Sequence, residues 1–175
     1  DRHCRYFHRQ FTTRSLLYTE MVAAAALVQG KAYHLLDYSQ EEHPLALQLG
    51  GSDPIQLADA AAIGEAHGSD EINLNVGCPS DRVQSGSFGA ILMKNPKLVA
   101  ACCKAMKKST SVDITVKCRI GVDDQDPEQI LPEFLNQIYY SGVSRVIIHA
   151  RKAILKGLSP KENRNCLLYT SPSPR

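Results

Sequence analysis

The chain has 175 residues, of which 43% are hydrophobic and 22% are charged, and its formal net charge is +2. This length and composition are typical of one globular domain, and the small net charge argues against a basic field over the whole surface. No apolar run is long enough to span a bilayer, and the first residues do not resemble a signal peptide, so we expect no membrane partner. The six cysteines form no C-x-x-C pair and no metal-ligand spacing, which argues for a reducing compartment and against a zinc site or a disulfide framework.

Short β-like runs alternate with helical stretches along the chain. We expect strands at residues 16–21, 44–49, 71–76, 113–119 and 145–150. We expect helices at residues 54–66, 96–107 and 127–140. The first helix has Ser52 or Asp53 as its cap, Pro54 in its first turn and Gly68 after its end. The strands recur about every 30 residues, which is the length of a βα unit, so the sequence predicts an α/β fold with parallel strands.

Two parallel architectures fit these elements, a doubly wound open sheet and a (β/α)8 barrel. A doubly wound dinucleotide-binding fold usually has a G-x-G-x-x-G turn after its first strand, and this sequence has none. The two ends of the chain depart from the pattern. The first residues resemble the middle of a helix, and residues 167–175 are rich in Pro and Ser, so we expect a fragment with a non-native or disordered tail at 165–175.

The stretch 73–80, Asn-Leu-Asn-Val-Gly-Cys-Pro-Ser, is the most informative in the chain. An apolar run stops at Gly77, which permits a sharp turn, and a proline restricts the backbone after Cys78. We therefore expect the thiol on a rigid loop at the carboxyl end of a strand, where α/β proteins usually place their chemistry. The alternative is a buried structural cysteine, which is how we interpret Cys102 and Cys103 on the apolar face of a helix.

Polar residues stand at the carboxyl end of every expected strand, where a barrel would gather them into one ring. They are Glu20, Gln48, Asn75, Cys78, Lys117, Arg119, His149 and Arg151. Amide, ammonium and imidazole donors suit an electron-rich ring or a phosphate, and a thiol can give or take a proton. Donors around a flat cofactor, with one acid on a loop, fit redox chemistry on a planar ring. Taken alone, His149 could equally be a satisfied polar group of the core.

Several motifs, in this order, resemble the tRNA-dihydrouridine synthases, and the A subfamily most closely. They are residues 41–44 with 48–52, 73–81 followed by Arg82-Val83-Gln84, 116–121, and 148–151 with 159–164. The resemblance covers residues 1–164 and implies a partial FMN-binding (β/α)8 TIM barrel of about five βα units. It also implies that the first strand of the barrel, its later strands and a C-terminal helical RNA-binding domain are absent from this chain.

The resemblance also implies an activity. Enzymes of this family reduce a uridine of the tRNA D-loop, here of the 20/20a type, to 5,6-dihydrouridine. NADPH would reduce the FMN, the flavin would deliver a hydride to C6 of the uracil, and Cys78 would protonate C5 as the general acid. The enzyme would use no metal. It would be cytoplasmic, or organellar where a targeting segment precedes Asp1.

The family's functional residues can be carried over one by one. FMN contacts fall on Gln48, Lys117 and His149. RNA contacts fall on Asn75, Arg151, Lys152, Lys161 and Arg164. A basic rim for backbone phosphates would consist of Lys152, Lys156, Lys161 and Arg164. Without the resemblance, a solvated charged loop is the more usual interpretation of such a rim.

Three other functions stay open on the residues alone. A different FMN barrel could reduce a free pyrimidine with the same Cys78 loop. A Schiff-base barrel could use Lys117 as its nucleophile. The chain could also be an inactive RNA-binding fragment.

Overall fold

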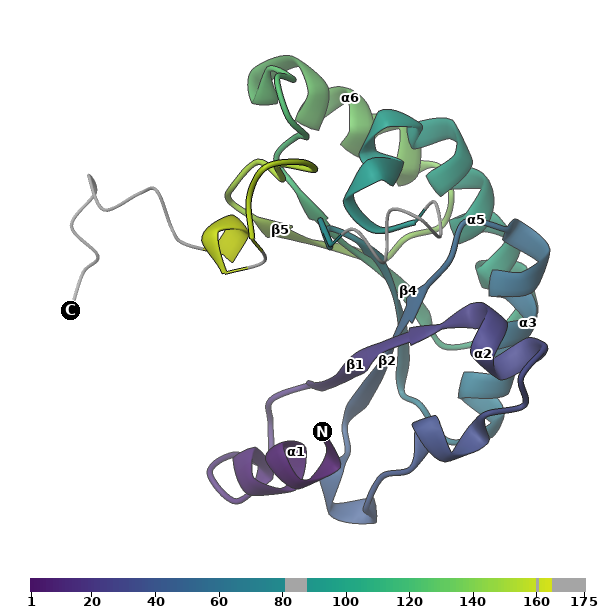
Figure 1. Ribbon diagram of the computed structural model, residues 1–175. Coiled ribbons are helices and arrows are strands. Elements are labelled where there is room, and N and C mark those ends of the chain that lie inside the picture. The colour runs from purple at the N-terminus through teal and green to yellow at the C-terminus, as the bar shows by residue number, and fades with distance from the viewer. Residues whose placement is uncertain (81–87, 160, 165–175) are drawn as a thin grey trace.

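The computed structural model describes residues 1–80, 88–159 and 161–164, and these contain one five-stranded sheet (Figure 1). Its strands are β1 (Leu17–Ala23), β2 (Leu45–Gly50), β3 (Glu71–Val76), β4 (Asp113–Arg119) and β5 (Arg145–His149). Each strand pairs in parallel with the next one along the chain. The tail expected at 165–175 and the Arg82-Val83-Gln84 part of the family motif lie outside the described residues.

The order of the strands in the sheet follows their order in the chain, without a reversal. A doubly wound sheet reverses its order at a switch point and carries helices on both faces. Figure 1 instead shows the α-helices that follow strands on one side of the sheet. They are α2 (Ala24–Val28), α3 (Pro54–Ala66), α5 (Pro96–Ser109) and α6 (Pro127–Tyr139). This is the arrangement of a (β/α)8 barrel, so the predicted α/β fold, a partial barrel of about five βα units, is confirmed.

The hydrophobic core lies between the sheet and these helices. Leu47, Ile72, Leu74 and Ile114, from the three central strands, have no exposed surface. A Cβ atom at Gly64 of α3 would lie 2.5 Å from Leu47 Cδ2 and 2.9 Å from Ile72 Cδ1. The absence of a side chain at Gly64 therefore lets α3 approach the sheet closely.

The predicted bounds of three elements, α3, β3 and β4, match the structure. Asp53 rather than Ser52 caps α3, because its carboxylate accepts hydrogen bonds from the backbone N–H groups of Ile55 (2.8 Å) and Gln56 (2.9 Å). The predicted end of the first strand at residue 21 is wrong, because β1 continues to Ala23. Glu20 therefore lies inside β1 rather than at its carboxyl end.

The two cysteines of α5 are packing residues, as expected. Cys102 and Cys103 have no exposed surface, and burial raises the pKa of each thiol to about 12. Cys118 of β4 is buried too, and burial raises the pKa of its thiol to about 11. At neutral pH these three groups are uncharged thiols and poor nucleophiles.

Short helices complete the described structure: α1 (Arg2–Arg9), η1 (Tyr33–Leu36), η2 (Gln40–Glu42), η3 (Gly89–Lys94) and η4 (Glu162–Arg164). In the structure, Asp1 is the N-cap residue of α1. Asp1 Oδ1 accepts a hydrogen bond from the backbone N–H of Cys4 at 2.8 Å.

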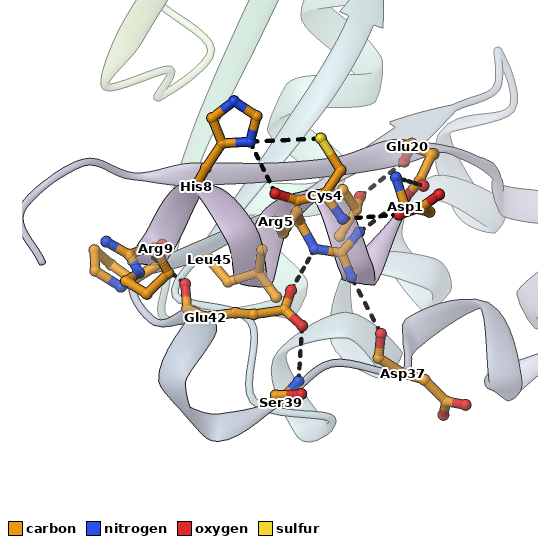
Figure 2. Close-up of polar contacts among 12 residues, drawn as sticks. Asp1, Cys4, Arg5, His8, Arg9, Glu20, Asp37, Ser39, Glu42 and Leu45 are labelled. Carbon is orange, nitrogen blue, oxygen red and sulfur yellow. Dashed lines mark hydrogen bonds and ion pairs between the residues drawn. The ribbon is translucent and has the colours of Figure 1, made fainter. Parts of the chain in front are cut away.

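A buried ion pair attaches α1 to the rest of the molecule (Figure 2). Arg5 Nε donates to Glu42 Oε2 at 2.5 Å, and Glu42 has no exposed surface. The other nitrogens of the guanidinium donate to Glu20 Oε2 (2.9 Å) and to the carbonyl of Asp37 (3.2 Å). Arg9, one turn along, donates to the carbonyl of Glu42 at 2.7 Å. Arginines rather than apolar residues therefore form the buried side of this helix.

Candidate active site

The face of the sheet opposite the helices carries polar side chains in its central strands. Side chains alternate along a strand, so Glu71, Asn73 and Asn75 of β3 share this face. Asn73 pairs in register with Gln48 of β2 and with Thr115 of β4. Gln48 Nε2 donates to Asn73 Oδ1 at 2.9 Å, and Asn73 Nδ2 donates to Thr115 Oγ1 at 2.8 Å. We call this surface the polar face.

The sequence does not predict Glu71, Asn73 and Thr115 as site residues, because they lie inside strands rather than at their ends. Polar residues at positions 71, 73 and 75 recur at every second residue of a strand. That alternation is the signal that identifies Glu71 and Asn73 on β3. Thr115 gives no signal of its own, since threonine is common in strands.

Cys78 lies in the loop that follows β3, as expected, and hydrogen bonds fix this loop. Asn75 Oδ1 accepts from the backbone N–H groups of Gly77 (3.1 Å) and Cys78 (2.9 Å). The carbonyl of Cys78 accepts from Ala90 N at 2.9 Å, and Arg119 Nε donates to the carbonyl of Gly77 at 3.0 Å. The backbone on both sides of the thiol is therefore held, while the side chain is only half-buried.

An open cleft of about 990 Å³ lies beside Cys78. Cys78, Ser80 and Phe88 form one part of its lining, and residues 20–23 of β1 form another. The thiol lies 3.5 Å from Ser80 Oγ. Gln48, Lys117 and His149 do not line the cleft. Cys78 lines it, and its backbone N–H donates to Asn75 of the polar face, so the Cys78 loop adjoins both.

Four basic side chains follow one another at the carboxyl ends of β4 and β5: Lys117, Arg119, His149 and Arg151. Burial, and then the charge of Arg119, lowers the pKa of Lys117. Burial, and then the charges of the other three, lowers the pKa of His149. Like charges that depress one another's pKa in this way are relieved by a bound anion. The arrangement therefore suits an anionic ligand.

Comparison with known proteins identifies the family. The model of the family "Dihydrouridine synthase (Dus)" matches residues 1–170. The chain belongs to the dihydrouridine synthase family. It is 61% identical over 165 residues to the tRNA-dihydrouridine(20/20a) synthases of Salmonella typhi and Escherichia coli (strain K12), and 58% identical over 164 residues to that of Xanthomonas axonopodis pv. citri (strain 306). These alignments cover 94% of the chain and 48 to 49% of the relatives, so the chain spans about half the length of the curated relatives it matches.

Within this dihydrouridine synthase fold, the three residues expected to contact FMN lie on the polar face. Gln48 is held by Asn73 and by Asn75, whose Nδ2 donates to Gln48 Oε1 at 2.9 Å. Lys117 pairs in register with Asn75, and His149 with Arg119. One continuous surface therefore carries all three side chains.

The residues expected to contact RNA differ in exposure. Lys161 is exposed, and Lys152 is half-buried with its Nζ donating to the carbonyl of Gln125 at 3.3 Å. Asn75 and Arg151 are only 9% and 8% exposed. The side chain of Arg164 lies outside the part of the chain that the structure describes. Their roles toward RNA stay predictions.

Two further observations concern the described residues only. No helix among them is long and apolar enough to cross a membrane. Nor do three or more His, Cys, Asp or Glu side chains of this part of the chain gather in a group that could hold a metal ion.

Proposed function

We propose that this chain forms part of a tRNA-dihydrouridine synthase that reduces D-loop uridines of the 20/20a type. Relatives whose names state this activity align with 94% of the chain, which supports the substrate class. The observation that carries the proposal is the position of Cys78. Its thiol is half-buried on a loop held by hydrogen bonds, and it faces a cleft large enough for a nucleobase.

FMN fits the donor chemistry of the polar face. Lys117 stands beside the cations Arg119 and Arg151, which suits an anionic ligand, while His149 adds an imidazole and Gln48 an amide. We expect Gln48, Lys117 and His149 to hold FMN, with NADPH as the electron donor. When bound, reduced FMN would supply the hydride that adds to C6 of the uracil.

Cys78 would supply the proton that completes the reduction. Its S–H bond breaks, a C–H bond forms at C5, and the thiolate is later reprotonated from solvent. Together with the hydride at C6, this step converts the C5=C6 double bond into a single bond. Arg119 lies close to this step, because its Nε donates to the carbonyl of Gly77 next to Cys78 at 3.0 Å.

The target base has to leave its stack to reach this thiol. The basic segment that would bind the tRNA backbone lies near the Cys78 loop, because Arg119 Nη1 donates to the carbonyl of Asn163 at 3.0 Å. Lys161, two residues away, is exposed and can reach a phosphate. This proximity supports tRNA as the partner.

Replacement of Cys78 tests the proposal. In a protein of the relatives' length that carries this chain, Cys78→Ala should retain FMN and its reduction by NADPH. Uridine reduction in a single turnover should fall at least about 100-fold, because a positioned general acid contributes about 10²- to 10⁴-fold. Flavin absorbance and dihydrouridine analysis of the tRNA measure the two effects separately.

Cys4→Ala is the matched control, since Cys4 is an exposed thiol outside the Cys78 loop and should leave both readouts unchanged. Turnover of Cys78→Ala near the wild-type rate would show that another group supplies the proton. Reduction of free uracil, with none of tRNA, would instead favour an FMN barrel acting on a free pyrimidine.

One observation favours a second candidate function, a Schiff-base barrel. Burial and the charge of Arg119 lower the pKa of Lys117, and a lowered pKa makes a lysine a better nucleophile. Borohydride would then trap a carbonyl substrate on Lys117. Tight binding of FMN to the same protein would count against this function.

A further inference from the structure

A single chain of hydrogen bonds connects the Cys78 loop to the interior of the sheet. Its members are polar side chains of the three central strands that bond one to the next. In order from the loop they are Asn75, Gln48, Asn73, Thr115 and Glu71. Asn73 and Thr115 have no exposed surface and Glu71 is 5% exposed, so these inner members are shielded from solvent.

Every bond of this chain donates in the same direction. Backbone N–H groups can only donate, so those of Gly77 and Cys78 require the oxygen of Asn75 to face them. The Nδ2 of Asn75 is then turned to Gln48 Oε1 at 2.9 Å. The donors continue through Gln48 and Asn73 to the hydroxyl of Thr115.

The other end of this chain of hydrogen bonds, at Glu71, requires the same direction of donation. Thr115 Oγ1 donates to Glu71 Oε1 at 2.6 Å, and a carboxylate can only accept. Tyr18 donates to the same oxygen at 3.0 Å, and Arg145 Nη2 forms an ion pair with Oε2. Burial, and then the charge of Glu71, raises the pKa of Tyr18, which keeps the phenol a donor. The two ends of the chain therefore agree on one orientation for every amide between them.

A buried polar chain could be no more than a satisfied interior, because buried polar atoms nearly always have partners. However, branched apolar side chains usually fill the inside of such barrels and need no partners. This chain of hydrogen bonds also begins at the backbone of Cys78 and includes the side chain of Gln48, and both groups belong to the proposed active site. In the part of the chain that the structure describes, Asn73 alone accepts from Gln48 Nε2, which leaves its second hydrogen for a ligand.

We propose that Glu71, Thr115 and Asn73 are positioning residues for the reaction. This proposal rests on the proposed function. The three residues orient the amide of Gln48 toward the flavin, and through Asn75 they hold the Cys78 thiol at the uracil. None of the three would touch FMN or the substrate. Their effect passes through the direction of the hydrogen bonds rather than through packing.

Two substitutions of Thr115 distinguish an effect of the hydrogen-bond direction from an effect of packing. Thr115→Val keeps the shape and loses the hydroxyl, whereas Thr115→Ser keeps the hydroxyl and leaves a small cavity. Two readouts are measured in the holoenzyme of the relatives' length. The first is the alkylation rate of Cys78 by iodoacetamide, followed on its peptide, and the second is the single-turnover rate of uridine reduction.

Thr115→Val removes both hydrogen bonds of the hydroxyl, to Asn73 and to Glu71. It should speed alkylation of Cys78 several-fold and slow uridine reduction about tenfold, a loss on the scale of the net contribution of buried hydrogen bonds. Thr115→Ser should match the wild type in both. Equal behaviour of Thr115→Val and the wild type, or equal loss in both variants, would overturn the proposal. If Thr115→Val does not fold, Glu71→Gln takes its place, because an amide can donate and no longer fixes the direction.

The two readouts distinguish this proposal from the proposed function. The alkylation rate requires neither flavin chemistry nor tRNA. If the wild type reduces no tRNA uridine, the proposed function fails, and alkylation alone still decides whether the chain of hydrogen bonds positions Cys78.

Discussion

At the scale of single residues, His149 is the group whose charge responds most directly to its surroundings. Burial and the charges of Arg119, Lys117 and Arg151 all disfavour its protonated form. The folded protein therefore binds a proton at His149 less readily than the unfolded chain does. As the pH falls below the ordinary histidine value of about 6.5, this difference lowers the free energy of unfolding, until the pH passes the depressed pKa of the folded state.

We predict that His149 titrates below 6.5 in the flavin-free protein, and that FMN raises its pKa because an added anion offsets the neighbouring cations. The imidazole Cε1–H resonance in an NMR titration measures both values, and its absence in His149→Gln assigns it. A pKa at or above 6.5 without FMN would contradict the cationic surroundings. A pKa unchanged by FMN would place the cofactor elsewhere.

The sequence predicts Cys78, Lys117 and His149 as site residues because a polar residue at a strand end departs from the apolar strand before it. It does not predict Asn73 or Thr115, because their role depends on which side chains of neighbouring strands meet. Register between strands far apart in the chain cannot be obtained from a single strand. Sequence patterns therefore predict the site residues at the strand ends better than those inside the strands.

At the scale of elements, α1 shows how a helix can be fixed by charge. Its buried residues are Arg5 and Arg9 rather than apolar side chains, so it has no apolar stripe that a sequence pattern could reveal. By contrast, α3 is predicted to the residue, since Asp53, Pro54 and Gly68 mark its ends. The end of β1 is predicted too early because no turn residue follows residue 21.

We predict that Glu42→Ala lowers the free energy of unfolding by about 3 kcal/mol, because it removes the fully buried carboxylate from the ion pair with Arg5. Glu41→Ala, a change in the neighbouring exposed carboxylate, should stay within about 0.5 kcal/mol of the wild type. Equilibrium unfolding in urea measures both. Equal effects of the two substitutions would show that the ion pair does not hold α1.

At the scale of the whole molecule, burial falls from the centre of the sheet to its edges. All six residues of β3 are buried, whereas β5 has exposed residues at Arg145 and Ile148. Among the described residues, β1 and β5 each pair with a single strand, and the register of β1 shifts between Tyr18 and Met21. The centre of the sheet is therefore its most stable part.

We predict that hydrogen exchange follows this gradient. Amides of β3, such as those of Ile72 and Leu74, should exchange most slowly, and amides of β5 should exchange fastest among the strands. Mass spectrometry of peptides from the exchanging protein measures the order. Equal protection of β3 and β5 would mean that the strands open together as one unit.

The guanidinium of Arg119 gives two distant segments a common position. It binds the carbonyl of Gly77, next to the thiol, and the carbonyl of Asn163, beside the basic residues. A force on either segment is therefore transmitted to the other through one rigid planar group. On the proposed function, the segment that binds the RNA backbone and the loop that carries the acid are therefore held in one alignment.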